Sequence, residues 1–149
     1  MRPLQDTGLS IKRLQMRHHR AMNAQLAALD ITLVQWDALR HLHRHPDASL
    51  HDLALFTFQT DQSFGALAAR LIARGLIERV PGPGRAIRHR LTTKGDKLRE
   101  TGAKLVDGVL AQSFAPLTER ELATLHRLLG KLMDSSSPYD QPLSRAQFP

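Results

Sequence analysis

Two short amphipathic helical patterns, followed by a turn that cannot be helical, constrain this chain of 149 residues more than any other feature. The first pattern begins at Ser49, with Asp52 three residues later, which is the spacing of a helix-capping box. The second begins near Thr60 and is predicted to end at Gly75, because glycine adopts a positive φ without steric cost. The apolar residues of the second pattern recur at spacings of three and four and define one helical face: Phe64, Leu67, Ala68 and Leu71.

A basic hairpin is predicted immediately after the second helix. Residues 76–80 and 86–91 have the pattern of short strands, and the sequence Pro-Gly-Pro-Gly-Arg at residues 81–85 is a turn that excludes helix. Two helices joined by a short turn and followed by such a hairpin have the order of a winged helix-turn-helix, a DNA-binding unit. We therefore predict a mainly α fold with a small β-wing, and we place the DNA-binding unit at residues 32–92.

The excess positive charge of the chain is concentrated in the hairpin and its flanks. Residues 70–99 contain nine basic and two acidic residues, and their net charge of +7 equals that of the whole chain. Residues 1–69 (seven basic, six acidic) and 100–149 (five basic, six acidic) nearly balance. A local cationic surface complements duplex DNA, which carries a phosphate about every 1.7 Å along its axis. The alternative is a solvated basic surface that binds nothing.

Length and composition exclude several other classes of protein. A chain of 149 residues suffices for one core but not for two ordinary domains, and 42% apolar with 23% charged residues is typical of a globular protein. No apolar run approaches the ~20 residues that span a bilayer. The N-terminal residues show no apolar signal region, so we expect a cytoplasmic protein with no membrane partner. The absence of cysteine excludes disulfides, thiolate metal sites and thiol-based redox sensing.

A long helical pattern precedes the predicted DNA-binding unit. Residues 1–8 have the composition of a loose arm, and residues 9–29 form a helical pattern whose apolar face is incomplete. A break follows, and Thr32 with Gln35 forms the capping box of the next helix.

Two more helices are predicted within residues 93–134, separated at Pro116, and the second begins with the capping box of Thr118 and Glu121. This last helix has a strongly apolar face: Leu122, Leu125, Leu128, Leu129, Leu132 and Met133. Because exposure of such an apolar face to water is unfavourable, we expect residues 9–29 and 93–134 to be dimerisation helices. A two-fold homodimer would then present two recognition helices to a pseudo-palindromic site. The tail, residues 135–149, is predicted to be flexible.

Three segments in this order resemble the MarR family of multiple antibiotic resistance regulators. Residues 33–39 (LVQWDAL) are similar to the start of that family's second helix, and residues 71–79 (LIARGLIER) to its junction of recognition helix and wing. Arg85 and residues 91–95 (LTTKG) are similar to its wing tip and the start of the following helix. The resemblance covers residues 9–133. It implies a winged helix-turn-helix with long terminal dimerisation helices and the function of a transcription regulator, most simply a repressor.

Two positions depart from the pattern of the family. Pro83 stands where the family's wing usually has an aspartate, two residues before the wing arginine. Gly65 and Ala66 stand where its recognition helix often has threonine and arginine. We therefore expect DNA recognition to depend on the wing and on backbone contacts more than is usual in the family.

The candidate base-reading residues lie at the start of the recognition helix: Thr60, Asp61, Gln62 and Ser63. The N-terminal residues of such a helix reach base edges. Gln62 could pair with adenine, Asp61 could accept from cytosine, and Ser63 could do either. Helix capping is an equally good interpretation of Thr60 and Asp61. Gly65 and Ala66 would let the helix approach DNA closely.

The candidate backbone-binding residues are the arginines of the helix and the wing. Arg70 and Arg74 could hold phosphates, or form a solvated face. Arg85, at the tip of the turn, is a candidate for the minor groove. Arg88 and Arg90 could flank the DNA backbone. Four aromatic residues are predicted to belong to the core rather than to stack on bases: Trp36, Phe56, Phe58 and Phe64.

The family resemblance also implies a pocket for a small aromatic or lipophilic effector near the first, second and fifth helices. The candidate lining residues are Arg17, His18, Met22 and Trp36. A second interpretation is metal sensing by the histidines at positions 41, 43, 45 and 51, because imidazole suits zinc. Only His41 and His45 share a helical face, however, and we assign no metal and no cofactor.

Two other functions compete with that of a sequence-specific regulator. A low-specificity architectural DNA-binding protein is the alternative that the few polar readers between Phe64 and Ala69 favour. An enzyme is disfavoured, because the chain has no G-x-G-x-x-G segment and no convincing pair of nucleophile and base.

Overall fold

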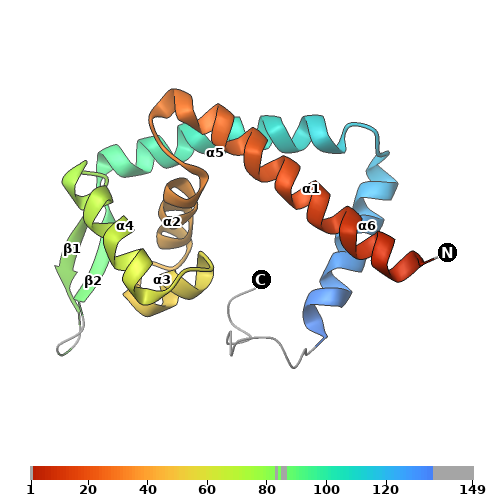
Figure 1. Ribbon diagram of the computed structural model, residues 1–149. Helices are drawn as coiled ribbons and strands as arrows, with labels where there is room; N and C mark the ends of the chain where they lie inside the picture. Colours follow the sequence, from red (N-terminus) through yellow and green to blue (C-terminus); the bar gives the residue numbers. More distant parts are fainter. Residues whose placement is uncertain (1, 83, 85–86, 136–149) are drawn as a thin grey trace. The chain divides into compact units, whose positions relative to one another are not determined.

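The computed structural model describes residues 2–82, 84 and 87–135, and its elements follow the predicted order of helices and hairpin (Figure 1). The chain divides into two compact units, residues 1–109 and 110–149. No helix in the described part of the chain is long and apolar enough to cross a membrane. The elements are α1 (Pro3–Leu26), the 3₁₀ helix η1 (Ala27–Leu29), α2 (Leu33–Arg44), α3 (Leu50–Phe56), α4 (Asp61–Ala73), β1 (Ile77–Pro81), β2 (Ile87–Leu91), α5 (Thr93–Phe114) and α6 (Glu119–Asp134).

Side-chain caps begin α2, α3, α4 and α6 at the residues that the sequence predicted. A hydroxyl oxygen accepts a hydrogen bond from the backbone N–H three residues later in each case, which satisfies one of the N–H groups that a helix leaves without an internal partner. The capping boxes of α2, α3 and α6 are complete, because the side chain three residues on also returns to the cap backbone. The capping residues are Thr32, Ser49, Thr60 and Thr118.

The core of the first unit joins the helix-turn-helix to the ends of α1 and α5. Leu26 is fully buried, and Trp36 is 6% exposed and donates its indole N–H to the carbonyl of Arg99 at 3.0 Å. A Cβ at Gly102 would lie 2.5 Å from Cδ1 of Trp36. Gly102 therefore lets α5 pack directly on the indole.

The hairpin is an antiparallel pair whose register runs from Ile77↔Leu91 to Pro81↔Ile87. β1 begins one residue later than predicted and extends to Pro81, and the described part of the second strand runs from Ile87 to Leu91 as predicted. Pro81 is tolerated because it lies at the end of a two-stranded sheet, where its missing N–H costs no ladder bond. Pro83, Arg85 and Ala86 of the predicted turn lie outside the described residues, whereas Gly84 has a positive φ of 67°.

Two expectations from the sequence are wrong. The residues expected to form a loose arm are helical from Pro3 onward, because proline is well placed in the first turn of a helix and Gly8 alone does not break it. Phe58 was expected in the core, but it is 83% exposed and has a φ of +56°. The other three aromatic residues of that prediction are buried or half-buried.

The second unit contains the end of α5 and all of α6, and α6 has no buried residue. Its apolar face is present as predicted, with Leu125 half-buried and the other members exposed. Leu132 and Met133 are 61% and 60% exposed. The predicted flexible tail from residue 136 onward lies outside the described residues.

Candidate nucleic-acid interface

The side chains at the start of α4 differ in the hydrogen bonds and ion pairs that they make within the protein. Oγ1 of Thr60 caps the helix through the N–H of Ser63 at 3.1 Å, and also donates to Oγ of Ser63 at 3.0 Å. Oδ1 of Asp61 lies 2.8 Å from Nδ1 of His51 on α3. The side chain of Gln62 is exposed and makes no hydrogen bond to another described residue. Of the four predicted base readers, Gln62 is therefore the one that can turn to DNA without giving up a contact.

The rest of the solvent face of α4 carries small side chains. Ala66, Ala69 and Ala73 are exposed, Gly65 is half-buried, and the buried face is formed by the four residues that the sequence predicted. Alanine offers DNA a methyl group and no hydrogen bond, so this face can approach a groove closely but can read only apolar features. Arg70 is exposed on the same helix and makes no ion pair with a described residue.

The C-terminal end of α4 is attached to its neighbours on both sides. Nη1 of Arg74 donates to the backbone carbonyl of Asp30 at 2.6 Å, and Nζ of Lys94 donates to the carbonyl of Arg74 at 2.9 Å. Oγ1 of Thr92 donates to the carbonyl of Gly75 at 2.6 Å. The Arg74 guanidinium, predicted to hold a phosphate, is thus committed to a loop carbonyl in this structure.

The arginines of the wing differ in their partners. Nε of Arg90 lies 2.5 Å from Oε1 of Glu78, its cross-strand neighbour. Arg88 is half-buried. The hydrogen bond from the Ser49 backbone is the main cause that lowers the pKa of Asp52, and the positive charge of Arg88 contributes to the same shift. Arg85 lies outside the described residues.

Arg79 is a candidate phosphate-binding residue that the sequence analysis did not single out. It is exposed on β1 and makes no ion pair with a described residue. The alternation of side chains along a strand could have identified it. Ile77 and Arg79 lie on the same face of β1, and this face is buried at Ile77 but exposed at Arg79. Among the described arginines of this surface that make no ion pair, Arg70 and Arg79 are exposed, whereas Arg88 is half-buried.

His89 lies opposite Arg79 in the hairpin and is only 3% exposed. Its Nδ1 is buried and has no hydrogen-bond partner among the described residues. Burial, followed by the positive charge of Arg79, lowers the pKa of His89 below its usual value of 6.5. The imidazole therefore folds in its neutral form and supports the wing as a core residue.

This pKa predicts how stability depends on pH. Because the unfolded chain binds a proton at His89 more readily than the folded chain, His89 makes folding less favourable as the pH falls below about 6.5, by up to about 1.4 kcal/mol for each unit by which the pKa is lowered. Urea unfolding of His89→Gln between pH 7.5 and 5 should show a weaker pH dependence than the wild type, while His126→Gln on the exposed surface of α6 should not. Equal pH dependence in all three proteins would contradict this role.

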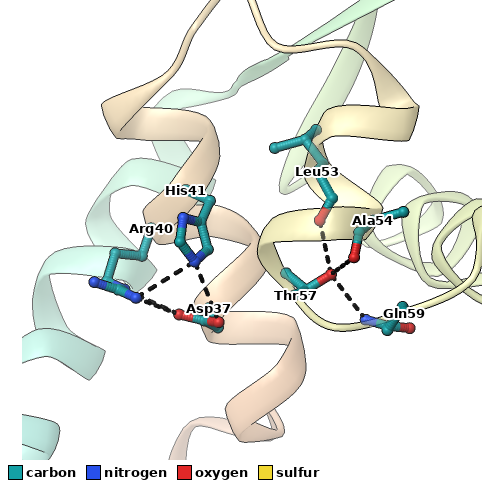
Figure 2. Close-up of polar contacts among 7 residues, drawn as sticks. All are labelled: Asp37, Arg40, His41, Leu53, Ala54, Thr57 and Gln59. Atoms are coloured by element: carbon teal, nitrogen blue, oxygen red, sulfur yellow. Dashed lines mark hydrogen bonds and ion pairs between the residues drawn. The ribbon is translucent and has the colours of Figure 1, made fainter. Parts of the chain in front are cut away.

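Asp37, Arg40 and His41 form a polar network on α2, shown beside the end of α3 in Figure 2. Oδ1 of Asp37 lies 2.8 Å from Nη2 of Arg40, and its Oδ2 lies 3.4 Å from Nε2 of His41. Burial opposes ionisation of Asp37, but the hydrogen bond with His41 and the charge of Arg40 prevail, so its pKa is lowered. The His41 ring also stacks on Phe56, with centroids 5.2 Å apart, as does His45 at 4.7 Å.

The histidines considered as metal ligands are engaged with other side chains. His43 lies 3.6 Å from Asp96, and His51 pairs with Asp61. In the part of the chain that the structure describes, no three histidine, aspartate or glutamate side chains come together to hold a metal ion. The stacking on Phe56 gives His41 and His45 a packing role.

The candidate effector-binding residues are not gathered in a described cavity. Trp36 is buried in the core, Arg17 is exposed, and His18 and Met22 are half-buried. A hollow of about 590 Å³ lies instead between the start of α2 and the end of α4. It has apolar walls with two guanidinium groups and is lined by Ala27, Asp30, Ile31, Thr32, Gln35, Arg70, Ala73 and Arg74.

An exposed recognition helix, a half-buried support helix and a basic antiparallel wing define a winged helix-turn-helix DNA-binding protein. A family model described as MarR family matches residues 29–86, which span α2 to the wing. The match covers less than half of the chain, and solved MarR structures resemble the chain at 26% and 28% identity, so the chain is similar to the MarR family of transcription regulators in its DNA-binding unit and in its fold.

Similarity to known proteins extends over most of the chain. The HTH-type transcriptional repressor IacR of Pseudomonas putida is 23% identical over 121 residues, which are 80% of this chain and 72% of that protein. A mutant of MarR from E. coli in complex with operator DNA superposes with a TM-score of 0.78 at 26% identity, over 89% of this chain and 96% of that chain. A MarR family protein of Mycobacterium tuberculosis in complex with salicylic acid gives a TM-score of 0.72 at 27% identity, over 84% and 94% of the two chains.

Proposed function

We propose that this protein is a dimeric repressor that binds a pseudo-palindromic operator through α4 and the wing. The observation that carries the proposal is that two kinds of free side chain occur among the described residues of this surface. Gln62, at the exposed start of α4, makes no side-chain hydrogen bond, and Arg70 and Arg79 lack a carboxylate partner among the described residues. Gln62 can read a base edge, and the two arginines can neutralise phosphates. The related MarR structure with operator DNA supports this use of the fold.

Selection of bound sequences from random duplex DNA, followed by footprinting of the selected site, tests the proposal. We expect two half-sites related by a two-fold axis, with centres about one helical turn, ~10 base pairs, apart. We also expect an affinity for the selected site ~10³-fold or more above that for random duplex. A ratio near one would favour an architectural DNA-binding protein, which the row of exposed alanines on α4 makes the second candidate.

We propose that the dimer is formed by the terminal helices. In the first unit, Leu4 and Ile11 of α1 are 88% and 50% exposed, and in the second unit α6 exposes most of its apolar face. Covering such faces with a second copy removes apolar surface from water at about 25 cal/mol per Å².

Charged substitutions on α6 should therefore separate the two chains. Leu129 and Leu132 are 43% and 61% exposed, so replacing both with glutamate should leave the helical fold of one chain intact and remove the dimer. Light scattering at micromolar concentration, with circular dichroism as the control for folding, measures both outcomes. A wild-type protein that scatters as a folded monomer would show that this assignment is wrong.

We further propose that a small aromatic acid releases the repressor from its operator. The hollow beside α4 combines apolar walls with the guanidinium of Arg70, which suits a planar carboxylate. The related protein that binds salicylic acid supports an effector of this class. Displacement of bound operator by salicylate, compared between Arg70→Ala and Arg17→Ala, distinguishes this hollow from a pocket near Arg17, His18, Met22 and Trp36.

A further inference from the structure

The helix ends before and after the recognition helix have the same backbone geometry but different residues at the strained position. At the end of α4, Gly75 has a φ of +71°, its N–H bonds to the carbonyl of Ile72 at 2.9 Å, and the next N–H, of Leu76, bonds to the carbonyl of Leu71 at 3.0 Å. This is a Schellman motif, in which glycine is the usual residue at the position of positive φ.

The end of α3 repeats this motif with phenylalanine in place of glycine. The N–H of Phe58 bonds to the carbonyl of Leu55 at 3.1 Å, and the N–H of Gln59 bonds to the carbonyl of Ala54 at 2.8 Å. Phe58 has a φ of +56°, a conformation that is a steric outlier for a bulky residue. The other non-glycine residue with a positive φ in the described chain, Asp30, is of a type that this region accepts more readily.

Side-chain hydrogen bonds hold the turn in this geometry, as Figure 2 shows at the end of α3. Oγ1 of Thr57 donates to the carbonyl of Leu53 at 2.8 Å, and Nε2 of Gln59 donates to Oγ1 of Thr57 at 3.3 Å. Thr57 is itself buried. The turn is therefore fixed on both sides of Phe58, and the surroundings impose the strained backbone that this residue would not adopt alone.

The phenyl ring is mostly exposed, so burial of its apolar surface does not offset the backbone strain. Phe58 is 83% exposed, and only Leu4 is more exposed among the large apolar residues of the described chain. It lies two residues before Thr60, the cap of α4, and so adjoins the end of α4 that carries Gln62. Strained backbone positions cluster at ligand-binding surfaces, so the strain at this exposed residue supports a role for the ring in contacting the ligand.

We propose that Phe58 is a specificity-determining residue whose ring contacts a thymine methyl group in the major groove of the operator. This inference rests on the proposed function. The chemistry of the surface favours thymine, because phenylalanine and alanine both read that methyl group and neither can bond a base edge. Ala66 and Ala69 of α4 are also exposed and offer methyl groups of the same apolar character.

Three substitutions at one position test the contact. Phe58→Gly removes both the ring and the backbone strain, Phe58→Asn removes the ring and tolerates the backbone, and Phe58→Leu retains an apolar side chain. Melting temperature should rise by about 2–4 °C in Phe58→Gly for each kcal/mol of strain relieved. Operator affinity should nevertheless fall in Phe58→Gly and Phe58→Asn by about fourfold for each methyl group no longer covered, and fall less in Phe58→Leu.

Deoxyuridine identifies the DNA partner, because it lacks only the methyl group of thymine. On the operator obtained by selection, replacing the contacted thymine with deoxyuridine should weaken the wild type by about fourfold and leave Phe58→Gly unchanged. The inference is overturned if Phe58→Gly binds the operator as tightly as the wild type, if deoxyuridine weakens both proteins equally, or if Phe58→Gly weakens binding to scrambled duplex by the same factor. Failure of the wild type to select any duplex would instead remove the proposed function.

Discussion

Replacing Gly95 with alanine should lower the free energy of unfolding by about 3 kcal/mol, the upper range for adding a methyl group to a packed site. A Cβ at this position would lie 1.9 Å from the carbonyl oxygen of Leu76 and 2.8 Å from its carbon. The clash is with backbone, which cannot turn aside as a flexible side chain can. The same carbonyl accepts a hydrogen bond from the backbone N–H of Thr92 at 3.1 Å, so the start of α5 cannot move away without breaking that bond.

Gly108 provides the matched control on the same helix. A Cβ there would meet no described atom within 4 Å, so Gly108→Ala should stabilise the protein by about 1 kcal/mol through its higher helix propensity. Urea unfolding followed by the fluorescence of Trp36, the only tryptophan of the chain, measures both variants. Similar stability of the two would show that α5 does not approach the backbone of Leu76 as closely as described.

Removing Arg85 should weaken binding to every duplex, whereas removing Gln62 should weaken binding mainly to the operator. Arg85 belongs to the densest cationic segment, and a phosphate or minor-groove contact there should contribute equally on all sequences. Arg85→Ala should also flatten the salt dependence by about one unit of slope for each phosphate that the arginine no longer neutralises. Gln62→Ala should cost about 1–3 kcal/mol on the operator and little on scrambled DNA.

A salt titration of both variants on operator and on scrambled duplex makes the comparison. Lys104→Ala is the charge control, because this lysine is exposed on α5, outside the proposed DNA-binding residues of α4 and the wing. If Arg85→Ala loses affinity only on the operator, the wing reads sequence or groove shape, and the two roles must be exchanged.

Local signals in the sequence predicted the elements well because each is determined by nearby residues. Hydroxyl caps at Thr32, Ser49, Thr60 and Thr118, and the positive φ of Gly75, act within one helical turn, so a pattern of three or four residues identifies them. Contacts between residues far apart in the chain were harder to predict from the sequence. The packing of Gly102 on Trp36 joins residues far apart in the chain, and a glycine gives no sign of which side chain it will admit.

The binding surface was predicted by residue type, and the structure adds which of those residues are already engaged. Arg74 and Gln62 were equal candidates from the sequence, yet the first bonds to the Asp30 carbonyl and the second has no such bond with the described residues. Phe58 was predicted to be buried because phenylalanine usually is. The Schellman motif that exposes it depends on hydrogen bonds from Thr57 and Gln59, which no periodicity reveals.

The unequal attachment of the two ends of α4 bears on how such a regulator can diverge. Its C-terminal end is bonded to the loop before α2 through the Arg74 side chain, which donates to the carbonyl of Asp30, and to the start of α5 through Lys94 and Thr92, which donate to the carbonyls of Arg74 and Gly75. Its N-terminal end is joined to α3 by a single exposed pair, His51 and Asp61, among the described side chains. Substitutions at the exposed positions Phe58, Gln62 and Ala66 can therefore change the preferred operator at little cost in folding, so that duplicated copies of the gene can acquire new targets while they keep one framework.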